Sequence, residues 1–256
     1  MQQERRNDIV FKIRKSRIVK VNDLMDEYHV SIETIRRDLE FLESEGYLRR
    51  VYGGAVLNDF YRPEQALSQR EQTNYLQKQA IGKLAVDFIE DGDTIYIDSG
   101  TTTIELTKHL GEKRNLTIIT NALLIAREAM ISNYDCRVIM LGGELRRNEL
   151  ATSGTGTTAD LNNFYMTKAF LSAGGISLKS GVTEYDLHDA ENRRLIPRRA
   201  EKIIMLADYS KFGITTMNYI MPIEDISVLI TDWNVPESVL EPYRSRGIEI
   251  HVAQPL

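Results

Sequence analysis

A run of small polar residues, Asp98-Ser99-Gly100-Thr101-Thr102-Thr103, follows an apolar stretch of the sequence. Backbone N–H groups at the start of a helix, together with serine and threonine hydroxyls, can hold a phosphate, and glycine allows a close approach to the backbone. The run therefore predicts an anion-binding loop between a strand and a helix. The absence of G-x-G-x-x-G at this position argues against an ordinary dinucleotide site.

Small or polar residues also follow other predicted strands. They are Thr120-Asn121, Gly142-Gly143-Glu144, Gly174-Gly175, and Lys211 shortly after Asp208 and Ser210. Each feature alone is often only a helix cap or a turn. In open α/β sheets, however, ligands bind beyond the carboxyl ends of the strands. The repeated occurrence of such residues at strand ends predicts one ligand pocket there.

The elements that must position this pocket alternate along the chain. Strands are expected at residues 94–98, 116–120, 137–141, 168–173, 202–206, 227–231 and 248–253. Helices are expected at residues 74–88, 121–131 and 187–200, and Pro197 should kink or break the last of these. Strands that alternate with helices predict an α/β domain with a mainly parallel sheet.

A second chemistry is indicated near the N-terminus, where residues 32–46 have the pattern of an amphipathic helix. Ser31 is a good N-cap and Gly46 fits the C-terminal stop. Apolar residues at helical spacing form a core-facing stripe, namely Ile32, Ile35, Leu39 and Leu42. Thr34 and Arg37 lie nearly opposite this stripe, and Arg36 lies nearer its edge. The helix thus exposes short polar groups and a guanidinium near its N-terminal end.

The neighbouring segments complete a winged helix-turn-helix. Helices are expected at residues 5–17 and 21–28, and a tight connection leads from the second into the third. Two β-like runs around Gly53-Gly54 predict a hairpin whose basic strand carries Arg49 and Arg50. The second helix of such a motif enters the major groove of DNA. We therefore expect Arg36 and Arg37 in a reading head, and Arg49 and Arg50 in a wing that contacts DNA phosphate or a minor groove.

Residues 21–56 closely resemble the winged helix-turn-helix of DeoR-type (DeoR/GlpR) bacterial transcriptional regulators. The motifs that carry the resemblance are S-x-x-T-I-R-R-D-L and L-R-R-V-x-G-G-A. The resemblance implies binding to double-stranded operator DNA. The DNA contacts that it implies are Ser31, Thr34, Arg36, Arg37, Arg49 and Arg50.

The larger part of the chain resembles the DeoR-type effector domain through DSGTTT, TN, GG and LADYSKFG. That domain is similar in fold to ribose-phosphate isomerase, glucosamine-phosphate deaminase and CoA transferase. The resemblance implies a repressor that senses a phosphorylated sugar and controls sugar uptake or catabolism. With the strand-end residues, it predicts effector contacts at Asp98, Ser99, Gly100, Thr101, Thr102, Thr103, Asn121, Gly143 and Lys211.

Two positions depart from the family pattern. Gly174 stands where many members carry an acid, and Arg193 stands where many carry a lysine, in Glu191-Asn192-Arg193-Arg194. We expect Glu191 and Arg193 to line the pocket as well. Gly174 has no side chain to serve as a base, and arginine cannot usefully exchange a proton at physiological pH. These departures favour a sensor that leaves its ligand unchanged over an enzyme.

Composition limits the alternatives. The chain has 256 residues and a formal net charge of −5. Residues 1–57 hold 11 basic and 10 acidic residues, which leaves 21 basic and 27 acidic residues in the remainder, so any DNA-binding surface must be local. Cys136 is the one cysteine and is expected to be a small buried residue. No Cys/His cluster suggests a metal, and we expect no cofactor.

No apolar run is long enough for a membrane span, and the polar N-terminus is unlike a signal peptide, so a cytoplasmic protein without membrane contact is expected. The expected organisation is a DNA-binding domain at residues 1–57, a linker at 58–73 and an effector domain at 74–256. We expect a homo-oligomer, a dimer or a tetramer, on a palindromic operator. Two alternatives stay open: a sugar-phosphate isomerase or deaminase that carries a DNA-binding domain, and a winged helix that contacts protein.

Overall fold

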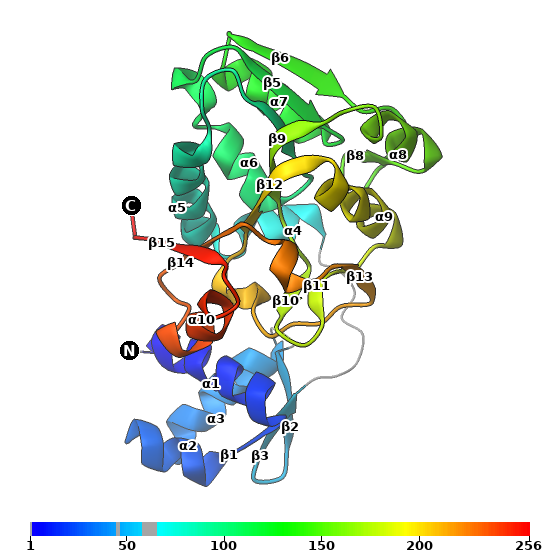
Figure 1. Cartoon of the computed structure of the whole chain (residues 1–256). Helices are drawn as coiled ribbons and strands as arrows, with labels where there is room; N and C mark the ends of the chain where they lie inside the picture. Colours follow the sequence, from blue (N-terminus) through cyan, green and yellow to red (C-terminus); the bar gives the residue numbers. More distant parts are fainter. Residues whose placement is uncertain (1, 45–46, 58–65) are drawn as a thin grey trace. The chain divides into compact units, whose positions relative to one another are not determined.

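The computed structural model describes residues 2–44, 47–57 and 66–256. The chain divides into two compact units, residues 1–63 and 64–256 (Figure 1). Each unit has its own hydrophobic core cluster.

The N-terminal unit is a winged helix-turn-helix. Its described elements are α1 Gln2–Ser16, β1 Ile18–Lys20, α2 Val21–Tyr28, α3 Ile32–Ser44, β2 Leu48–Val51 and β3 Gly54–Leu57. The three expected helices and the hairpin are confirmed. The short strand β1 was not expected, and it pairs antiparallel with β3 in the sheet order β1-β3-β2. The expected stop at Gly46 lies outside the described residues.

Local chemistry explains how α3 begins and how the hairpin packs. The Ser31 Oγ accepts the backbone N–H of Thr34 at 3.3 Å, which confirms Ser31 as the N-cap. Ile35 and Leu39 of the expected stripe are fully buried. In the hairpin, a Cβ at Gly54 would lie 2.1 Å from the Val19 carbonyl oxygen. Glycine at this position therefore allows β3 to pair with β1.

A buried carboxylate joins α1 to α3. Asp38 is fully buried and accepts hydrogen bonds from the Arg5 Nε at 2.6 Å and the Arg6 Nε at 2.7 Å. The Arg6 guanidinium also lies over the Phe41 ring, 3.9 Å from its centroid. A buried charge is tolerated when it is paired and hydrogen-bonded. Asp38 thus fixes the recognition helix α3 against the helix that supports it.

The second unit begins with a helix inside the expected linker. Residues 67–72 form α4, Leu67–Gln72, so the second half of the range 58–73 is helical. Residues 58–65 lie outside the described residues. The next helix, α5 Tyr75–Ala85, is shorter than the expected 74–88, because the chain continues as a 3₁₀ turn, η1 Val86–Phe88.

Within residues 66–256, seven strands form a parallel sheet in the order β15-β14-β12-β9-β4-β5-β6. Their bounds are β4 Thr94–Ile97, β5 Leu116–Thr120, β6 Cys136–Met140, β9 Met166–Leu171, β12 Ala200–Leu206, β14 Val228–Asp232 and β15 Glu249–Ala253. Each lies where a strand was expected, to within two residues at either end. The expected α/β class is confirmed.

Helices pack along this sheet. Their bounds are α6 Thr101–Thr107, α7 Leu123–Ser132, α8 Thr155–Leu161, α9 Leu187–Leu195 and α10 Glu237–Arg244. Helix α5 contacts β14 and β15, α7 contacts β5 and β6, and α6 lies between α5 and α7 (Figure 1). Fully buried Ile81, Ile95 and Phe170 belong to the core beneath them. None of the described residues forms a helix long and apolar enough to cross a bilayer.

Two small antiparallel sheets were not expected. One contains β10 Gly175–Ser177, β11 Gly181–Glu184 and β13 Asn218–Met221, and the other pairs β7 Glu144–Arg146 with β8 Ala151–Ser153. Their three- and four-residue strands are too short to show a clear alternation of apolar and polar residues. The expected helix at 187–200 was too long, because α9 ends at Leu195. Pro197 follows in a 3₁₀ turn, η3 Ile196–Arg198, as a break at proline requires.

The Asp38 contacts give a direct stability prediction. In the Asp38→Asn variant, the Arg5 and Arg6 guanidinium groups lose the carboxylate that they share in a buried site. Breaking such a pair should destabilise the N-terminal unit by about 3 kcal/mol. Urea unfolding followed by circular dichroism measures this, with Asp26→Asn, an exposed position on α2, as the control. Equal stability of the two variants would contradict the proposed role of Asp38.

Candidate functional site

The strand order places a switch point between β4 and β9. From β4 the chain adds β5 and β6 on one side, whereas β9, β12, β14 and β15 lie on the other. Ligand crevices of open α/β sheets lie at such points, beyond the carboxyl ends of the strands. Asp98 follows β4, and Ser172 follows β9. The Asp98 Oδ2 accepts the Ser172 N–H at 3.2 Å and its hydroxyl at 3.3 Å, so these two expected strand ends meet.

Arg193 on α9 closes the network at this point. Its guanidinium is 3% exposed. The Nε donates to the Asp98 Oδ2 at 2.7 Å, Nη2 donates to the Ser99 carbonyl at 3.0 Å, and Nη1 donates to the Glu184 carboxylate. One side chain from α9 therefore joins the end of β4 to the end of β11.

Glu184 stands close to the position of the missing acid. A Cβ built at Gly174 would lie 2.9 Å from the Glu184 Oε1. The carboxylate that the family pattern places at position 174 thus has a spatial substitute from β11, and this substitute pairs with Arg193. Glu184 was not predicted from the sequence, because β11 was not expected.

Burial dominates the electrostatics of the network. It raises the pKa of Asp98 to about 6, against the opposing charge of Arg193. It also raises the pKa of Asp189, which Arg193 and Arg146 oppose. Burial alone would lower the pKa of Arg193, but Asp98 and Glu184 raise it well above its ordinary value. Arg193 therefore stays charged, and Asp98 is the group whose protonation responds to pH near neutrality.

A second ion-pair group adjoins the first. The Arg146 Nη1 contacts the Asp186 Oδ1 at 2.8 Å, and its Nη2 donates to the Asp189 Oδ2 at 2.5 Å. Asp186 also caps α9 by accepting the N–H groups of His188 and Asp189. Among the described residues, several buried polar atoms here have no hydrogen-bond partner: Arg146 Nε, Asp189 Oδ1, and both Nδ2 and Oδ1 of Asn192. Polar atoms of this kind normally have partners, so they point to a polar ligand.

The Asp98–Thr103 loop is internally bonded. The Thr103 hydroxyl donates to the Asp98 carbonyl at 2.7 Å and is 2.8 Å from the Gly100 carbonyl. A Cβ at Gly100 would lie 2.3 Å from the Ser172 Oγ. The close approach that requires glycine is therefore to Ser172. The remaining expected loop residues, Ser99, Thr101 and Thr102, are buried.

Other expected residues take structural positions around this edge. Asn121 is buried, accepts the Tyr96 hydroxyl at 3.1 Å and donates to the Thr152 carbonyl at 2.9 Å. Gly143 has φ 131°, and a Cβ there would lie 2.2 Å from the Thr157 Oγ1. Glu191 does not join the network, because its side chain is exposed and lies 3.7 Å from the His188 Nδ1. Its neighbours on α9, not Glu191 itself, face the edge.

Lys211 lies in a separate charged group near the ends of β12 and β14. It is half-buried in the turn η4 Tyr209–Lys211, after Asp208. The Asp208 Oδ1 accepts the Asn74 Nδ2 at 3.1 Å. Asp232 accepts the Tyr209 N–H at 2.7 Å, and burial raises the pKa of Asp232 to about 7, with a further contribution from Asp208.

In the N-terminal unit, Arg36, Arg37 and Arg49 are exposed. Arg50 is also exposed but is engaged, because its N–H and its Nε each donate to Glu43 at 2.7 Å. The Arg50 Nη2 is also 3.7 Å from the Glu40 Oε1. A contact between Arg50 and DNA would require Arg50 to leave Glu43.

A hollow of about 650 Å³ separates α3 from the hairpin turn of this wing. Its lining includes Arg36, Arg50 and Tyr52. The Tyr52 side chain is fully exposed at the turn and had not been expected as a contact. The exposed groups thus surround a concave surface of the kind that a DNA backbone can enter.

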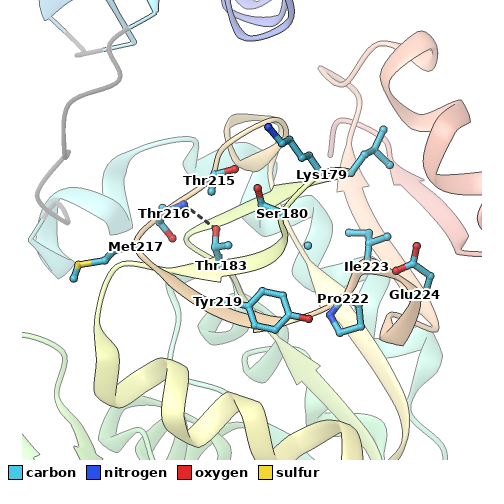
Figure 2. Close-up of a pocket in the computed structure, with 12 residues that line it drawn as sticks. Lys179, Ser180, Thr183, Thr215, Thr216, Met217, Tyr219, Pro222, Ile223 and Glu224 are labelled. Carbon is cyan, nitrogen blue, oxygen red and sulfur yellow. Dashed lines mark hydrogen bonds between the residues drawn. The ribbon is translucent and has the colours of Figure 1, made fainter.

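A second hollow, of about 450 Å³, lies on the sheet of β10, β11 and β13 (Figure 2). The Thr216 N–H donates to the Thr183 Oγ1 at 2.9 Å in its wall. None of the residues expected from the sequence lines it. Its charged lining residues, Lys179 and Glu224, are exposed, so it lacks the buried charges found at the strand ends.

Comparisons with known proteins match both units. Residues 5–60 match the DeoR-like helix-turn-helix domain, and residues 73–233 match the DeoR C terminal sensor domain. The chain belongs to the DeoR family. It is thus a DNA-binding transcriptional regulator, and the expected family and fold are confirmed.

Relatives that match this DeoR-family chain over nearly their whole lengths are named as transcriptional regulators. A protein of Escherichia coli O157:H7 named as a repressor of the aga operon is 33% identical over 96% of this chain and 92% of its own. The regulator GolR of Listeria innocua is 30% identical, and the glycerol-3-phosphate regulon repressor of E. coli K12 is 29% identical, each over 98% of this chain and 98–99% of its own. These names support a regulator and not the enzyme alternative.

Among solved structures, a ribose-5-phosphate isomerase in complex with phospho-erythronic acid shows a weaker likeness to this chain. It is 19% identical with a TM-score of 0.39, and covers 53% of this chain and 52% of its own. A likeness at this level carries no argument about function.

Among the described residues, no group of three His, Cys, Asp or Glu side chains is placed to hold a metal ion.

The raised carboxyl pKa values predict a pH dependence of stability. Asp98 and Asp232 hold protons in the folded protein at pH values where they are ionised in the unfolded chain. Their contribution to the free energy of unfolding therefore falls as pH rises from 3.8 to about 6 for Asp98, and from 3.8 to about 7 for Asp232.

Asp232→Asn should flatten this fall up to about pH 7, whereas loss of the Asp98 charge would also remove one of the two carboxylates that pair with Arg193. Urea unfolding at a series of pH values measures the slopes. Asp87→Asn, at an exposed position, should leave the slope unchanged. Parallel curves for Asp232→Asn and the unaltered chain would contradict the assignment.

Proposed function

We propose that this regulator is a repressor of a sugar uptake or catabolism operon and is released from its operator by a phosphorylated sugar. The observation that carries the proposal is the group of buried polar atoms on α9 and β7 that lack protein partners at the switch point of the sheet. The names of relatives, which include repressors of the aga operon and the glycerol-3-phosphate regulon, support it.

The chemistry of this edge suits a polyol. Carboxylates accept hydrogen bonds from hydroxyl groups, and the Asn192 amide can both donate and accept. Asp189 and Asn192 each offer an unsatisfied buried atom, beside a guanidinium held by Asp98 and Glu184. We place the sugar hydroxyls at this acidic part of the edge. The anionic group of the effector requires cationic side chains near it. Lys211 is one such side chain that the sequence predicts as an effector contact.

On the DNA side, we propose that Ser31, Thr34, Arg36, Arg37 and Arg49 contact the operator, with Arg50 joining them if it exchanges Glu43 for phosphate. Exposed guanidinium groups on α3 can read guanine edges, whereas those of the wing neutralise phosphate. Two copies in a symmetric dimer, or four in a tetramer, would place two such heads on a palindromic operator.

Asn192 gives a test that separates binding from folding. Its buried amide has no protein partner among the described residues, so Asn192→Ala should cost little stability. Loss of its hydrogen bonds to a ligand should weaken binding by about 1 kcal/mol, roughly fivefold. Calorimetry with a panel of sugar phosphates, each beside its unphosphorylated form, measures this. Only phosphorylated forms should bind well.

Asn133→Ala is the matched control, because Asn133 is equally buried but donates to the Leu110 and Lys113 carbonyls at 2.8 and 2.9 Å. This control should lose stability and keep its ligand affinity. Equal binding of phosphorylated and unphosphorylated sugars would remove phosphate from the proposal. Unchanged affinity in Asn192→Ala would move the sugar away from α9.

The reading head and the wing should respond differently to mutation. Arg37→Ala should lose about 1–3 kcal/mol of operator affinity, because a contact with a base edge is removed. Arg49→Ala should weaken binding to every sequence and reduce the salt dependence by about one phosphate contact. Gel-shift titrations at two salt concentrations measure both. Arg127→Ala, exposed in the other unit, is the control. Wild-type operator affinity in both variants would overturn the assignment.

A further inference from the structure

Lys78 on α5 is a buried cation that forms no ion pair with a carboxylate among the described residues. The residue is 4% exposed. Among the residues that the structure describes, its Nζ has one hydrogen-bond acceptor, the Arg70 carbonyl, and forms no ion pair. An ammonium carries three donors, and burying it without a counter-charge is costly. Among the described side chains, this ammonium therefore has no direct counter-charge, and Asp208 and Glu105 act on it without an ion pair.

Other cations surround this ammonium. Burial is the main reason that the pKa of Lys78 is lowered to about 8; the charge of Asp208 opposes this shift, and the charges of Lys211 and Arg70 add to it. Lys211, like Lys78, forms no ion pair within the described parts of the chain. Lys78 on α5, Arg70 on α4 and Lys211 in η4 are thus close enough for the last two charges to act on the first, as do those of Asp208 and Glu105. A region with these three cations fits an anion.

Arg70 is the one of these cations that is already occupied. Its guanidinium forms an ion pair with Glu149, in the turn between β7 and β8, and both side chains are mostly buried. Burial raises the pKa of Glu149, which Arg70 opposes and Asp189 reinforces. The charges of Asp189 and Arg146, which belong to the group that we assign to the sugar hydroxyls, therefore act on Glu149.

Helix α4, which carries Arg70, is held mainly by polar contacts. None of its residues is fully buried. The contacts around it include the Arg70–Glu149 ion pair, the Lys78 bond to the Arg70 carbonyl, and the Asn74 bond to Asp208 just beyond the helix. An element without a buried apolar anchor depends on such contacts, so an anion that redirects Arg70 would change how α4 is held.

We propose that Lys78 anchors the anionic group of the effector, and that this group takes Arg70 from Glu149 when it binds. The inference rests on the proposed function and adds to it a subsite for a phosphate-like dianion. Arg70 and Lys78 supply charge-assisted hydrogen bonds to its oxygens, with Lys211 beside them. The ion pair with Glu149 opens, and Glu149 is left beside Arg146 and Asp189.

This exchange offers a route from the ligand to the operator. Residue 67, where α4 begins, follows the N-terminal unit by only a few residues of chain, since that unit ends at residue 63. A ligand changes operator affinity only when it binds one arrangement of the protein better than another. The two partners of Arg70 define two such arrangements, one with Glu149 and one with the anion.

Calorimetric titration of the full chain with inorganic phosphate, at constant ionic strength set with sodium chloride, tests the subsite. Lys78→Met should weaken phosphate binding at least tenfold, as expected for the loss of a charge-assisted contact. It should also raise the Tm by roughly 2–4 °C, because an unpaired buried charge is removed. Lys83→Met, exposed on the same helix, should leave both quantities unchanged.

A double-mutant cycle tests the exchange of partners. Glu149→Gln should bind phosphate about tenfold more tightly, because the competitor for Arg70 is weakened. Arg70→Met should bind it about tenfold more weakly, and the double variant should equal Arg70→Met alone. Additive effects of the two substitutions, or weaker binding in Glu149→Gln, would overturn the exchange.

A pH series with sulfate, whose charge is constant, keeps the subsite testable if Lys78→Met does not fold. Wild-type affinity should fall by up to tenfold per pH unit above pH 8, and Lys78→Arg should flatten this fall, because arginine stays charged beside Asp208, Lys211, Arg70 and Glu105. A pH dependence that is the same in Lys78→Arg would contradict the role of Lys78.

The outcomes separate this inference from the proposed function. If a sugar phosphate binds Lys78→Met as tightly as wild type, the subsite is wrong and the proposed function stands. If phosphate binding depends on Lys78 but no phosphorylated sugar alters operator binding, the subsite stands and the proposed function fails.

Discussion

A guanidinium buried between two carboxylates is the constraint on which the sensor domain depends. Arg193 could not be buried without Asp98 and Glu184, and each of them comes from a different element. The pairing fixes α9 against the end of β4, and β11 against both. It also keeps a fixed positive charge at the switch point of the sheet. The unsatisfied atoms of Asp189 and Asn192 lie on the same helix, so the rigid ion pair positions the groups that we assign to the ligand.

The parallel sheet could be predicted because each of its strands is a short apolar run between helical patterns, and buried parallel strands have that composition. The strand ends at Asp98 and Asn121 were therefore predicted as well. Glu184, Arg146 and Lys78 were not. Glu184 and Arg146 lie in short antiparallel strands without a readable period, and Lys78 looks like a surface residue until its burial is known. The predicted effector contact at Glu191 is not supported by the structure, because a helical position two residues from Arg193 points to a different side of α9, and Glu191 is exposed there.

Sensing and DNA binding both use paired charges, but in different ways. In the N-terminal unit, Asp38 holds Arg5 and Arg6 to fix α3, and Glu43 holds Arg50 beside an open hollow. In the sensor domain, Glu149 holds Arg70 in the same manner. The fully buried Asp38 carboxylate fixes structure, whereas the more exposed Arg50–Glu43 pair can be exchanged for a DNA phosphate, and we propose the same exchange for the mostly buried Arg70–Glu149 pair. The charges that we propose to be functional are those whose present partner can be replaced.

Operator binding and sugar-phosphate binding should be thermodynamically coupled, and this coupling can be measured from both sides. Operator affinity should be measured by fluorescence anisotropy with and without a saturating sugar phosphate, and sugar-phosphate affinity by calorimetry with and without saturating operator. Linkage requires the same factor in both, about 5- to 150-fold for typical coupling. We expect each ligand to weaken the binding of the other by that factor. A sugar phosphate that binds at the strand ends and leaves operator affinity unchanged would contradict it.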